Sequence, residues 1–254
     1  MIFGTIYTGV FNENYIVVAM DSRVTQLDLT QRKDNVCKIL PIADHLVFFS
    51  AGLTEAMRQG GIGFNDRQIA IETYRGINNH APIVDIAAGW SRAMIKAYKS
   101  FFSNNPEDIR KIYEHNQNLI SGYWGGEDLN GRLVLYDAEI VLSASGNVSG
   151  HDVVSVSPGK GENTHVIGNG NLQILQEMNG VGTSERGKAI MDAIRAESEG
   201  KSRPEKEAIW ASHITRSLVD WGNDPRAGGE VVTLILERGQ KWRWFPRSDL
   251  CPKN

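Results

Sequence analysis

The chain has 254 residues, of which 41% are hydrophobic and 22% charged, as in an ordinary globular protein. Its net charge of -3 gives no electrostatic footprint for nucleic acid, and it has no run of about 18 apolar residues that could span a membrane. We therefore expect a single domain, 1–254, that binds neither nucleic acid nor a membrane.

The two cysteines, Cys37 and Cys251, lie far apart in the sequence and form neither a CxxC metal motif nor a disulfide framework. The first residues lack the basic start and the long apolar core of a signal peptide. A reducing cytosol suits such a chain, so the sequence predicts a cytoplasmic protein.

The first fifty residues predict a series of strands. Residues 5–10 are rich in β-formers, and residues 16–20 are continuously apolar, as in a strand covered on both faces. The polar residues 22–35 predict a loop or a ragged hairpin. Two further strands are expected, at 36–42 and 45–50.

Helical patterns follow these strands. Residues 53–57 are typical of a helix start, and residues 67–77 and 84–102 carry helical spacing. The last of these patterns places five apolar residues on one stripe: Ile86, Trp90, Met94, Ile95 and Tyr98. Acidic residues after Pro106 favour the first turn of another helix, whose pattern continues to Ser121.

The second half returns to strands and closes with helices and a hairpin. Strands are expected at 133–136, 139–142, 153–156 and 165–167. Helices are expected at 172–178, 184–198 and 204–221, and a last strand pair at 230–237 and 241–245. This order predicts an α+β fold, a four-layer αββα sandwich of two antiparallel sheets flanked by helices.

Cofactor and metal motifs are weak in this sequence. The turn Gly168-Asn169-Gly170 lacks the third glycine of a dinucleotide fingerprint, and none of the six histidines pairs at a metal-ligand spacing. A Ser-His-Asp triad stays open because triads assemble from distant positions, although no Gly-x-Ser-x-Gly elbow is present. We expect no metal and no organic cofactor.

Thr5 is the most specific candidate for chemistry. A threonine hydroxyl becomes a useful nucleophile when a neutral α-amino group on the same residue takes its proton. Thr5 has that amine only if the bond from Gly4 is cut, so residues 1–4 would be a short, self-removed propeptide. Asp21 and Lys38, near adjoining strand-like runs, are the candidate acid and cation. The simpler alternative is that Thr5 is an ordinary β-branched residue of a first strand.

Six stretches occur in a fixed order along the chain: 4–10, 16–25, 38–42, 50–52, 168–170 and 224–229. The second contains Asp21-Ser22-Arg23, and Asp21 follows Thr5 by sixteen positions. Together the stretches resemble, over most of the chain, the proteasome β-subunit family of N-terminal-nucleophile (Ntn) hydrolases. The resemblance implies the Ntn hydrolase fold, with extra residues at 65–82 and 104–131.

The resemblance also implies a role for each matching residue. Thr5 would be the nucleophile, and its freed amine would carry the proton. Lys38 would lower the pKa of that amine or hydroxyl through its positive charge, while Asp21 holds Lys38 and orients Thr5. The backbone N–H of Gly52 would stabilise the tetrahedral oxyanion.

The last two stretches contain one residue that fits the family and two that differ from it. Asp224 would support the threonine amine, and Asn169 stands where the family has a serine near that amine. Ala227 stands where the late motif has another serine, and an alanine side chain cannot form a hydrogen bond. These departures keep a second hypothesis open, a non-catalytic, proteasome-like structural subunit. A third hypothesis is an amidase of the same fold that acts on a small molecule.

The expected function is therefore an N-terminal-threonine hydrolase that cleaves peptide or amide bonds after self-processing at Gly4-Thr5. By resemblance, we expect a ring-like homo-oligomer. The substrate pocket is expected between the polar loop at 26–35 and the residues that follow Gly52.

Overall fold

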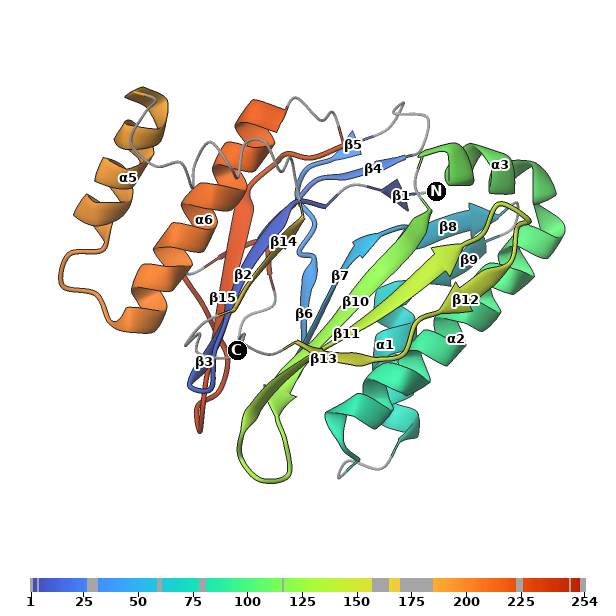
Figure 1. The fold of residues 1–254 in the computed structure, drawn as a ribbon, viewed down its shortest axis with the longest axis horizontal. Coiled ribbons are helices and arrows are strands. Elements are labelled where there is room, and N and C mark those ends of the chain that lie inside the picture. The colour runs from blue at the N-terminus through green and yellow to red at the C-terminus, as the bar shows by residue number, and fades with distance from the viewer. Residues whose placement is uncertain are drawn as a thin grey trace.

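The computed structural model describes residues 2–3, 5–26, 32–58, 61–77, 81–115, 117–156, 165–169, 185–222, 226–246 and 248–251. It is a mixed α+β fold in which antiparallel strands form three sheets, with five helices among the described residues (Figure 1). No helix in these stretches is long and apolar enough to cross a membrane.

The largest sheet, called here the long sheet, comes from the middle of the chain. Its strands are β6 (Ile39–Ala43), β7 (Leu46–Gly52), β10 (Asn118–Glu127), β11 (Leu133–Leu142), β12 (Val148–Gly150) and β13 (Val154–Val156). Their order is β12-β11-β10-β7-β6, and β13 also pairs with β11. Pro41 lies on the edge strand β6, where its missing N–H does not interrupt an internal ladder.

A second sheet, called here the terminal sheet, joins strands from both ends of the chain. Its strands are β2 (Tyr7–Phe11), β3 (Tyr15–Asp21), β14 (His165–Asn169), β15 (Val231–Glu237) and β16 (Arg243–Trp244). Their order is β14-β2-β3-β15-β16, so β3 lies at the centre with a neighbour on each side.

The third sheet, called here the small sheet, contains the first strand of the chain. Its strands are β1 (Ile2–Phe3), β4 (Val24–Gln26), β5 (Arg32–Lys33), β8 (Glu55–Arg58) and β9 (Gly61–Asn65). Their order is β5-β4-β1-β8-β9, and the expected ragged hairpin at 22–35 is the antiparallel pair β4 and β5.

The long sheet and the terminal sheet pack face to face because side chains alternate along each strand. Every second residue of β3 joins one buried cluster with β7: Ile16, Val18, Met20, Val47 and Phe49. The residues between them join another cluster with a late helix, α6 (Arg203–Gly222): Tyr15, Val17, Ala19, Ala208 and Ala211. The expectation that this apolar run is covered on both faces is therefore confirmed.

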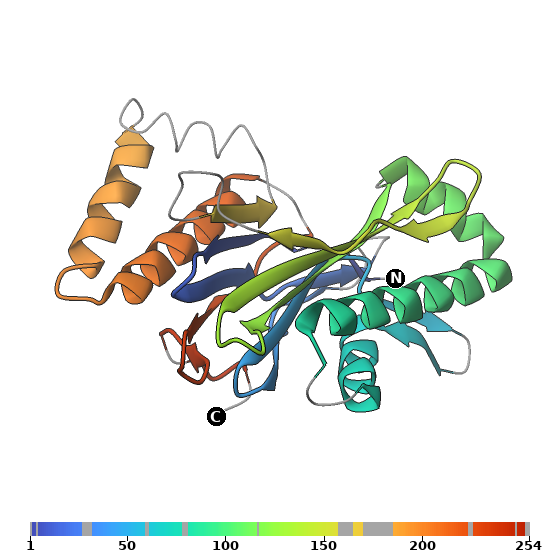
Figure 2. The same cartoon turned by 60° about the horizontal axis from the view of Figure 1, so that its bottom comes forward.

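The helices lie on the outer faces of these two sheets (Figures 1 and 2). Beside the long sheet lie α1 (Asp66–Gly76), α2 (Ile83–Asn104) and α3 (Pro106–His115). Beside the terminal sheet lies α6, and α5 (Glu185–Glu197) packs on α6. The expected stripe of α2 is buried at Ile86, Trp90, Met94 and Tyr98, whereas Ile95 is only partly buried.

Two secondary-structure expectations are wrong. Residues 53–57 do not begin a helix; β8 occupies most of this segment and pairs with β1 and β9, because tertiary pairing overrides the local pattern. The helix after Pro106 ends at His115 and does not reach Ser121, which lies in β10. The candidates at 133–136 and 139–142 are one continuous strand, β11, and the helix expected at 172–178 lies outside the described residues.

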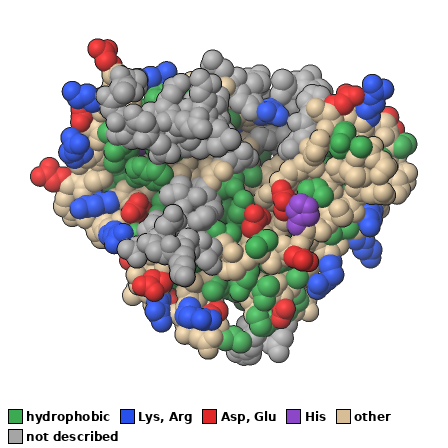
Figure 3. Space-filling model, viewed as in Figure 1, with side chains coloured by type: hydrophobic (Ala, Val, Ile, Leu, Met, Phe, Trp, Pro, Cys, Tyr) green, Lys and Arg blue, Asp and Glu red, His purple; other side chains and the backbone are tan. Residues whose placement is uncertain are grey.

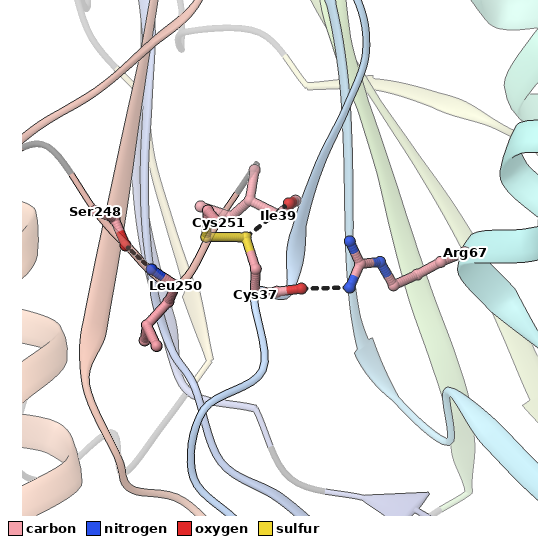
Figure 4. The surroundings of a disulfide bond; sticks show 6 residues. All are labelled: Cys37, Ile39, Arg67, Ser248, Leu250 and Cys251. Atoms are coloured by element: carbon pink, nitrogen blue, oxygen red, sulfur yellow. Dashed lines mark hydrogen bonds between the residues drawn. A yellow bond between two sulfur atoms is a disulfide. The ribbon is translucent and has the colours of Figure 1, made fainter. Parts of the chain in front are cut away.

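The expectation that the cysteines stay unpaired is also wrong. Cys37 and Cys251 form a disulfide with a Cα–Cα distance of 5.2 Å (Figure 4). The last described residues return beside β15 and β16, so both cysteines share a small cluster with Val232 and Trp244. Because disulfides persist in oxidising compartments, the cysteines no longer support the expected reducing environment.

Charged side chains are mixed on the face shown in Figure 3, where acidic and basic groups alternate over short distances among the described residues. This pattern fits the small net charge of the sequence.

Candidate active site

A buried carboxylate at the end of β3 organises the candidate site. Asp21 is 1% exposed. Its Oδ1 accepts hydrogen bonds from Lys38 Nζ and from the Ile6 backbone N–H, both over 2.8 Å. Its Oδ2 accepts a bond from the Gly228 N–H over 3.0 Å. One side chain therefore joins the residue after Thr5, the segment before β6 and the segment before β15.

Lys38 is the cationic partner of Asp21 in this site. Its side chain is 7% exposed, and burial lowers its pKa while the adjacent Asp21 carboxylate opposes that change. The bond to Asp21 fixes the Lys38 side chain at the cavity that Thr5 also lines. The structure thus brings Lys38 and Asp21 together as expected.

Thr5 lies two residues before the start of β2 and is 8% exposed. Two hydrogen bonds fix the next residue, Ile6. Its N–H donates to Asp21 Oδ1, and its carbonyl accepts from the Asp21 N–H over 3.0 Å. Thr5 and Lys38 line the same cavity, which measures about 310 Å³. Three of the six predicted site residues are therefore assembled in one place.

Gly52 ends β7, between two residues that line this cavity, Ser50 and Thr54. Its φ of +128° is a backbone conformation that side chains rarely allow. A Cβ atom here would collide with the Leu119 carbonyl oxygen of the paired strand β10, so this close backbone approach requires glycine. The predicted oxyanion residue therefore stands at a position where only glycine fits.

The late stretch 224–229 contacts the early stretch 16–25 at Asp21. Besides the Gly228 bond to that carboxylate, the Arg23 N–H donates to the Gly228 carbonyl over 3.0 Å. Nη1 of Arg23 donates to the Ala227 carbonyl, also over 3.0 Å. The two stretches that the resemblance links, 21–23 and 227–229, are therefore in direct contact.

For Asn169, the structure describes the backbone pairing only. It ends β14 opposite Tyr7 of β2, two residues along the chain from Thr5. Gly4 and Asp224 lie outside the described residues, so the expected cleavage site and the expected support for the amine are predictions from sequence alone.

The cavity has a mostly polar lining: Thr5, Val24, Lys33, Val36, Lys38, Ser50, Thr54, Glu55, Asn65, Asp66 and Arg67. Lys33 comes from the loop at 26–35, and Thr54 and Glu55 follow Gly52, as the sequence predicts for the pocket. The residues at the start of α1 were not predicted. The signal that could have found them is the pair Asn65-Asp66, which is typical of a helix start.

Asp66 is a buried carboxyl group at this helix start, with 1% exposure. It accepts hydrogen bonds from the Ser50 hydroxyl and, over 2.7 Å, from the Arg67 N–H. Burial raises its pKa to about 6, although the Ser50 hydrogen bond and the charge of Arg67 oppose this rise. Asn65 caps the helix by accepting from the Gln68 N–H over 3.0 Å.

The strand β1 lies in a slot beside the cavity. It pairs antiparallel with β4, where Ile2 is opposite Gln26 and Phe3 is opposite Thr25. On its other side Ile2 is opposite Glu55 of β8, which lines the cavity. The gap between β4 and β8 therefore accommodates one extended chain that leads directly to Thr5.

Among the described residues, no group of three or more His, Cys, Asp or Glu side chains could hold a metal ion. Comparison with models of protein families and with curated proteins finds no match to this chain.

Proposed function

We propose that the protein is an N-terminal-threonine hydrolase resembling proteasome β subunits, which cleaves peptide or amide bonds after self-processing at Gly4-Thr5. The observation that carries this proposal is the Asp21 carboxylate, which binds both Lys38 and the residue after Thr5. The packing of two sheets between outer helices supports the four-layer Ntn fold that accompanies this activity.

Self-processing creates the catalytic amine. The Thr5 hydroxyl attacks the Gly4 carbonyl, the amide becomes an ester, and the Thr5 amine is released. Water then hydrolyses the ester and frees residues 1–4. The hydrogen bonds at Ile6 favour this attack because they fix the backbone on one side of the bond.

Substrate hydrolysis follows the same chemistry. The Thr5 amine accepts the hydroxyl proton while Oγ attacks the substrate carbonyl, and the Gly52 N–H stabilises the oxyanion. The amine then gives its proton to the leaving amine, and water hydrolyses the ester left on Thr5. Lys38 disfavours a protonated Thr5 amine through its charge, and Asp21 holds Lys38 in place.

The slot between β4 and β8 supports a peptide as the substrate. An extended peptide adds to a sheet edge through main-chain hydrogen bonds, and β1 already pairs in that manner on both sides. Once residues 1–4 are removed, the same slot would receive the substrate. Assembly into a ring-like homo-oligomer is part of the proposal by resemblance only.

The test combines intact mass and N-terminal sequencing with a fluorogenic peptide assay. The purified wild-type chain should begin at Thr5 and hydrolyse peptides, and Thr5→Ala should keep residues 1–4 and lose hydrolysis. Thr73→Ala, on α1 and away from the cavity lining, is the matched control and should behave as wild type. Unchanged hydrolysis by Thr5→Ala would contradict the proposal.

The second candidate is a non-catalytic, proteasome-like structural subunit. Ala227 favours it, because this buried residue offers only its backbone carbonyl, which Arg23 already occupies. A threonine-directed electrophile discriminates the two: an adduct on Thr5 supports the hydrolase, and an unlabelled, unprocessed chain supports the structural subunit. Labelling without any peptide turnover would favour the third reading, an amidase of the same fold acting on a small molecule.

A further inference from the structure

The Cys37–Cys251 disulfide lies directly before the lysine of the candidate site. Cys37 precedes Lys38, whose side chain lines the cavity and donates to Asp21 Oδ1. The strand β6 begins one residue later, so both residues lie in an irregular stretch, 34–38. The cross-link is therefore a covalent anchor for a lysine that lies outside the strand ladders.

The backbone of Cys37 also holds a second residue of the cavity lining. Its carbonyl accepts a hydrogen bond from Nη1 of Arg67, near the start of α1 (Figure 4). Arg67 lines the same cavity as Lys38. A movement at residue 37 therefore reaches two cationic side chains of the candidate site, one through the peptide bond and one through this hydrogen bond.

The other cysteine belongs to a segment without regular secondary structure, because residues 248–251 contain no helix or strand. Both cysteines are buried in a small cluster with Val232 and Trp244 of the terminal sheet. Irregular segments open locally at a lower free-energy cost than the strands of a sheet. Local opening of 248–251 therefore gives a reductant access to the two sulfurs.

We propose that the Cys37–Cys251 disulfide is a redox switch of the candidate active site. With the bond formed, the two cationic side chains are held at the cavity. After reduction by a dithiol, residues 34–38 loosen and hydrolysis slows. This inference rests on the proposed function, because hydrolysis at Thr5 is the activity that is switched. The bond makes the enzyme active in an oxidising environment and slow in a reducing one.

The switch proceeds by thiol–disulfide exchange. A thiolate of the dithiol attacks one sulfur of the bond, forms a mixed disulfide and releases the other cysteine as a thiolate, which takes up a proton. The second thiol of the reductant then attacks the mixed disulfide and displaces the remaining cysteine. The protein thus gains two electrons and two thiol protons, while the reductant becomes a cyclic disulfide. Oxidised dithiol reverses both steps.

The experiment uses the full wild-type chain in buffers of reduced and oxidised dithiothreitol. Alkylation with intact mass gives the fraction of disulfide, and a fluorogenic peptide gives the rate of hydrolysis. Hydrogen exchange within minutes reports on residues 34–38, where the Val36 N–H donates to the Ser22 carbonyl over 3.0 Å, with β10 as the protected reference. Complete reduction should lower kcat/KM roughly 10- to 100-fold, because the side chains are misplaced, and should speed exchange at 34–38. Reoxidation should reverse both changes.

Cys251→Ser fixes the reduced state without a reductant. It should have the low kcat/KM of the reduced wild type and should not respond to dithiothreitol. Ser248→Ala is the matched control, because it removes the hydroxyl that accepts from the Leu250 N–H over 3.2 Å and leaves both cysteines in place (Figure 4). This variant should keep the wild-type rate and the wild-type response to reduction.

The outcomes separate this inference from the proposed function. Hydrolysis that is unchanged or faster after complete reduction would overturn the inference and leave the proposed function intact. Unchanged exchange at 34–38 would also overturn it, since a loss of activity would then arise elsewhere. Faster exchange at 34–38 on reduction, in a chain that neither hydrolyses peptides nor labels at Thr5, would support the disulfide as the anchor of the cavity and reject the proposed function.

Discussion

Lys38 Nζ lies 2.8 Å from Asp21 Oδ1, and both side chains are almost completely removed from solvent. Two backbone donors, from Ile6 and Gly228, complete the surroundings of the carboxylate. The cost of desolvating two charges offsets much of their attraction, so a buried pair of this kind adds little net stability. Its contribution is to hold one arrangement, in which Lys38 stays beside Thr5.

The first prediction concerns this pair. Asp21→Asn should lower the free energy of unfolding by about 3–5 kcal/mol, because Lys38 would be left as an unpaired buried charge. Peptide hydrolysis and processing should fall below detection, since the amide cannot accept all three donors. Urea unfolding and intact mass measure the two effects.

A double variant separates stability from function. Asp21→Asn combined with Lys38→Met leaves no buried charge, so it should recover part of the lost stability. It should remain inactive because the cation is gone. Full activity in the double variant would remove Lys38 from the proposed mechanism.

The second prediction concerns the disulfide. Cys37 and Cys251 are separated by 214 positions, and cross-linking such a long loop stabilises a fold by about 2–4 kcal/mol. Cys251→Ser should lower the free energy of unfolding by that amount. Hydrolysis should fall as well, because Cys37 precedes Lys38 and its carbonyl anchors Arg67. Urea unfolding and the peptide assay measure both losses.

Reductant provides the control for the disulfide. Dithiothreitol should destabilise the wild type towards the level of Cys251→Ser and leave that variant unchanged. Two titratable thiols in native protein purified without reductant would show that the bond does not form.

Local patterns in the sequence were sufficient for the core of the fold. The unbroken apolar run of β3 indicated a strand buried on both faces, and the 3.6-residue apolar stripe of α2 indicated its buried face. Segment 53–57 lacked such a signal, because β8 exists through its pairing with β1, a strand fifty residues away in the chain. The Cys37–Cys251 bond likewise depends on where the end of the chain returns, which no local pattern contains.

Only some residues of the candidate site could be predicted from the sequence. Thr5, Asp21 and Lys38 were expected together because the stretches that contain them resemble those of proteasome β subunits. Asp66 and Arg67 were missed: the pair Asn65-Asp66 indicates a helix start, but only the packing of α1 beside the long sheet brings that start to the cavity. The polar character of the cavity is therefore information that the structure adds.

The third prediction concerns pH. Burial raises the pKa of Asp66 to about 6 from an ordinary value of 3.8, so between these values the folded protein holds a proton that the unfolded chain has released. The free energy of unfolding should therefore fall as the pH rises from about 4 to 6, by up to about 3 kcal/mol at 1.36 kcal/mol per pKa unit. Denaturant unfolding across this range measures the slope.

The Asp66 contribution is isolated by substitution. Asp137, whose pKa burial also raises to about 6, adds to the same slope, so Asp66→Asn should reduce the slope without abolishing it. Asp85→Asn removes an exposed carboxylate at the start of α2 and is the control. An unchanged slope in Asp66→Asn would mean that this carboxyl group is ionised normally in the folded protein.

The last prediction concerns Gly52. In Gly52→Ala, the new Cβ would meet the Leu119 carbonyl oxygen at 2.3 Å in a backbone conformation that alanine rarely adopts, so the end of β7 must shift. If the Gly52 N–H stabilises the oxyanion, kcat should fall by about 100- to 1000-fold. Gly131→Ala is the control: it also has a positive φ, +68°, but open space around its Cβ, so it should lose a little stability and keep its kcat. Equal kcat values in the two variants, in protein shown to be folded by circular dichroism, would place the oxyanion donor elsewhere.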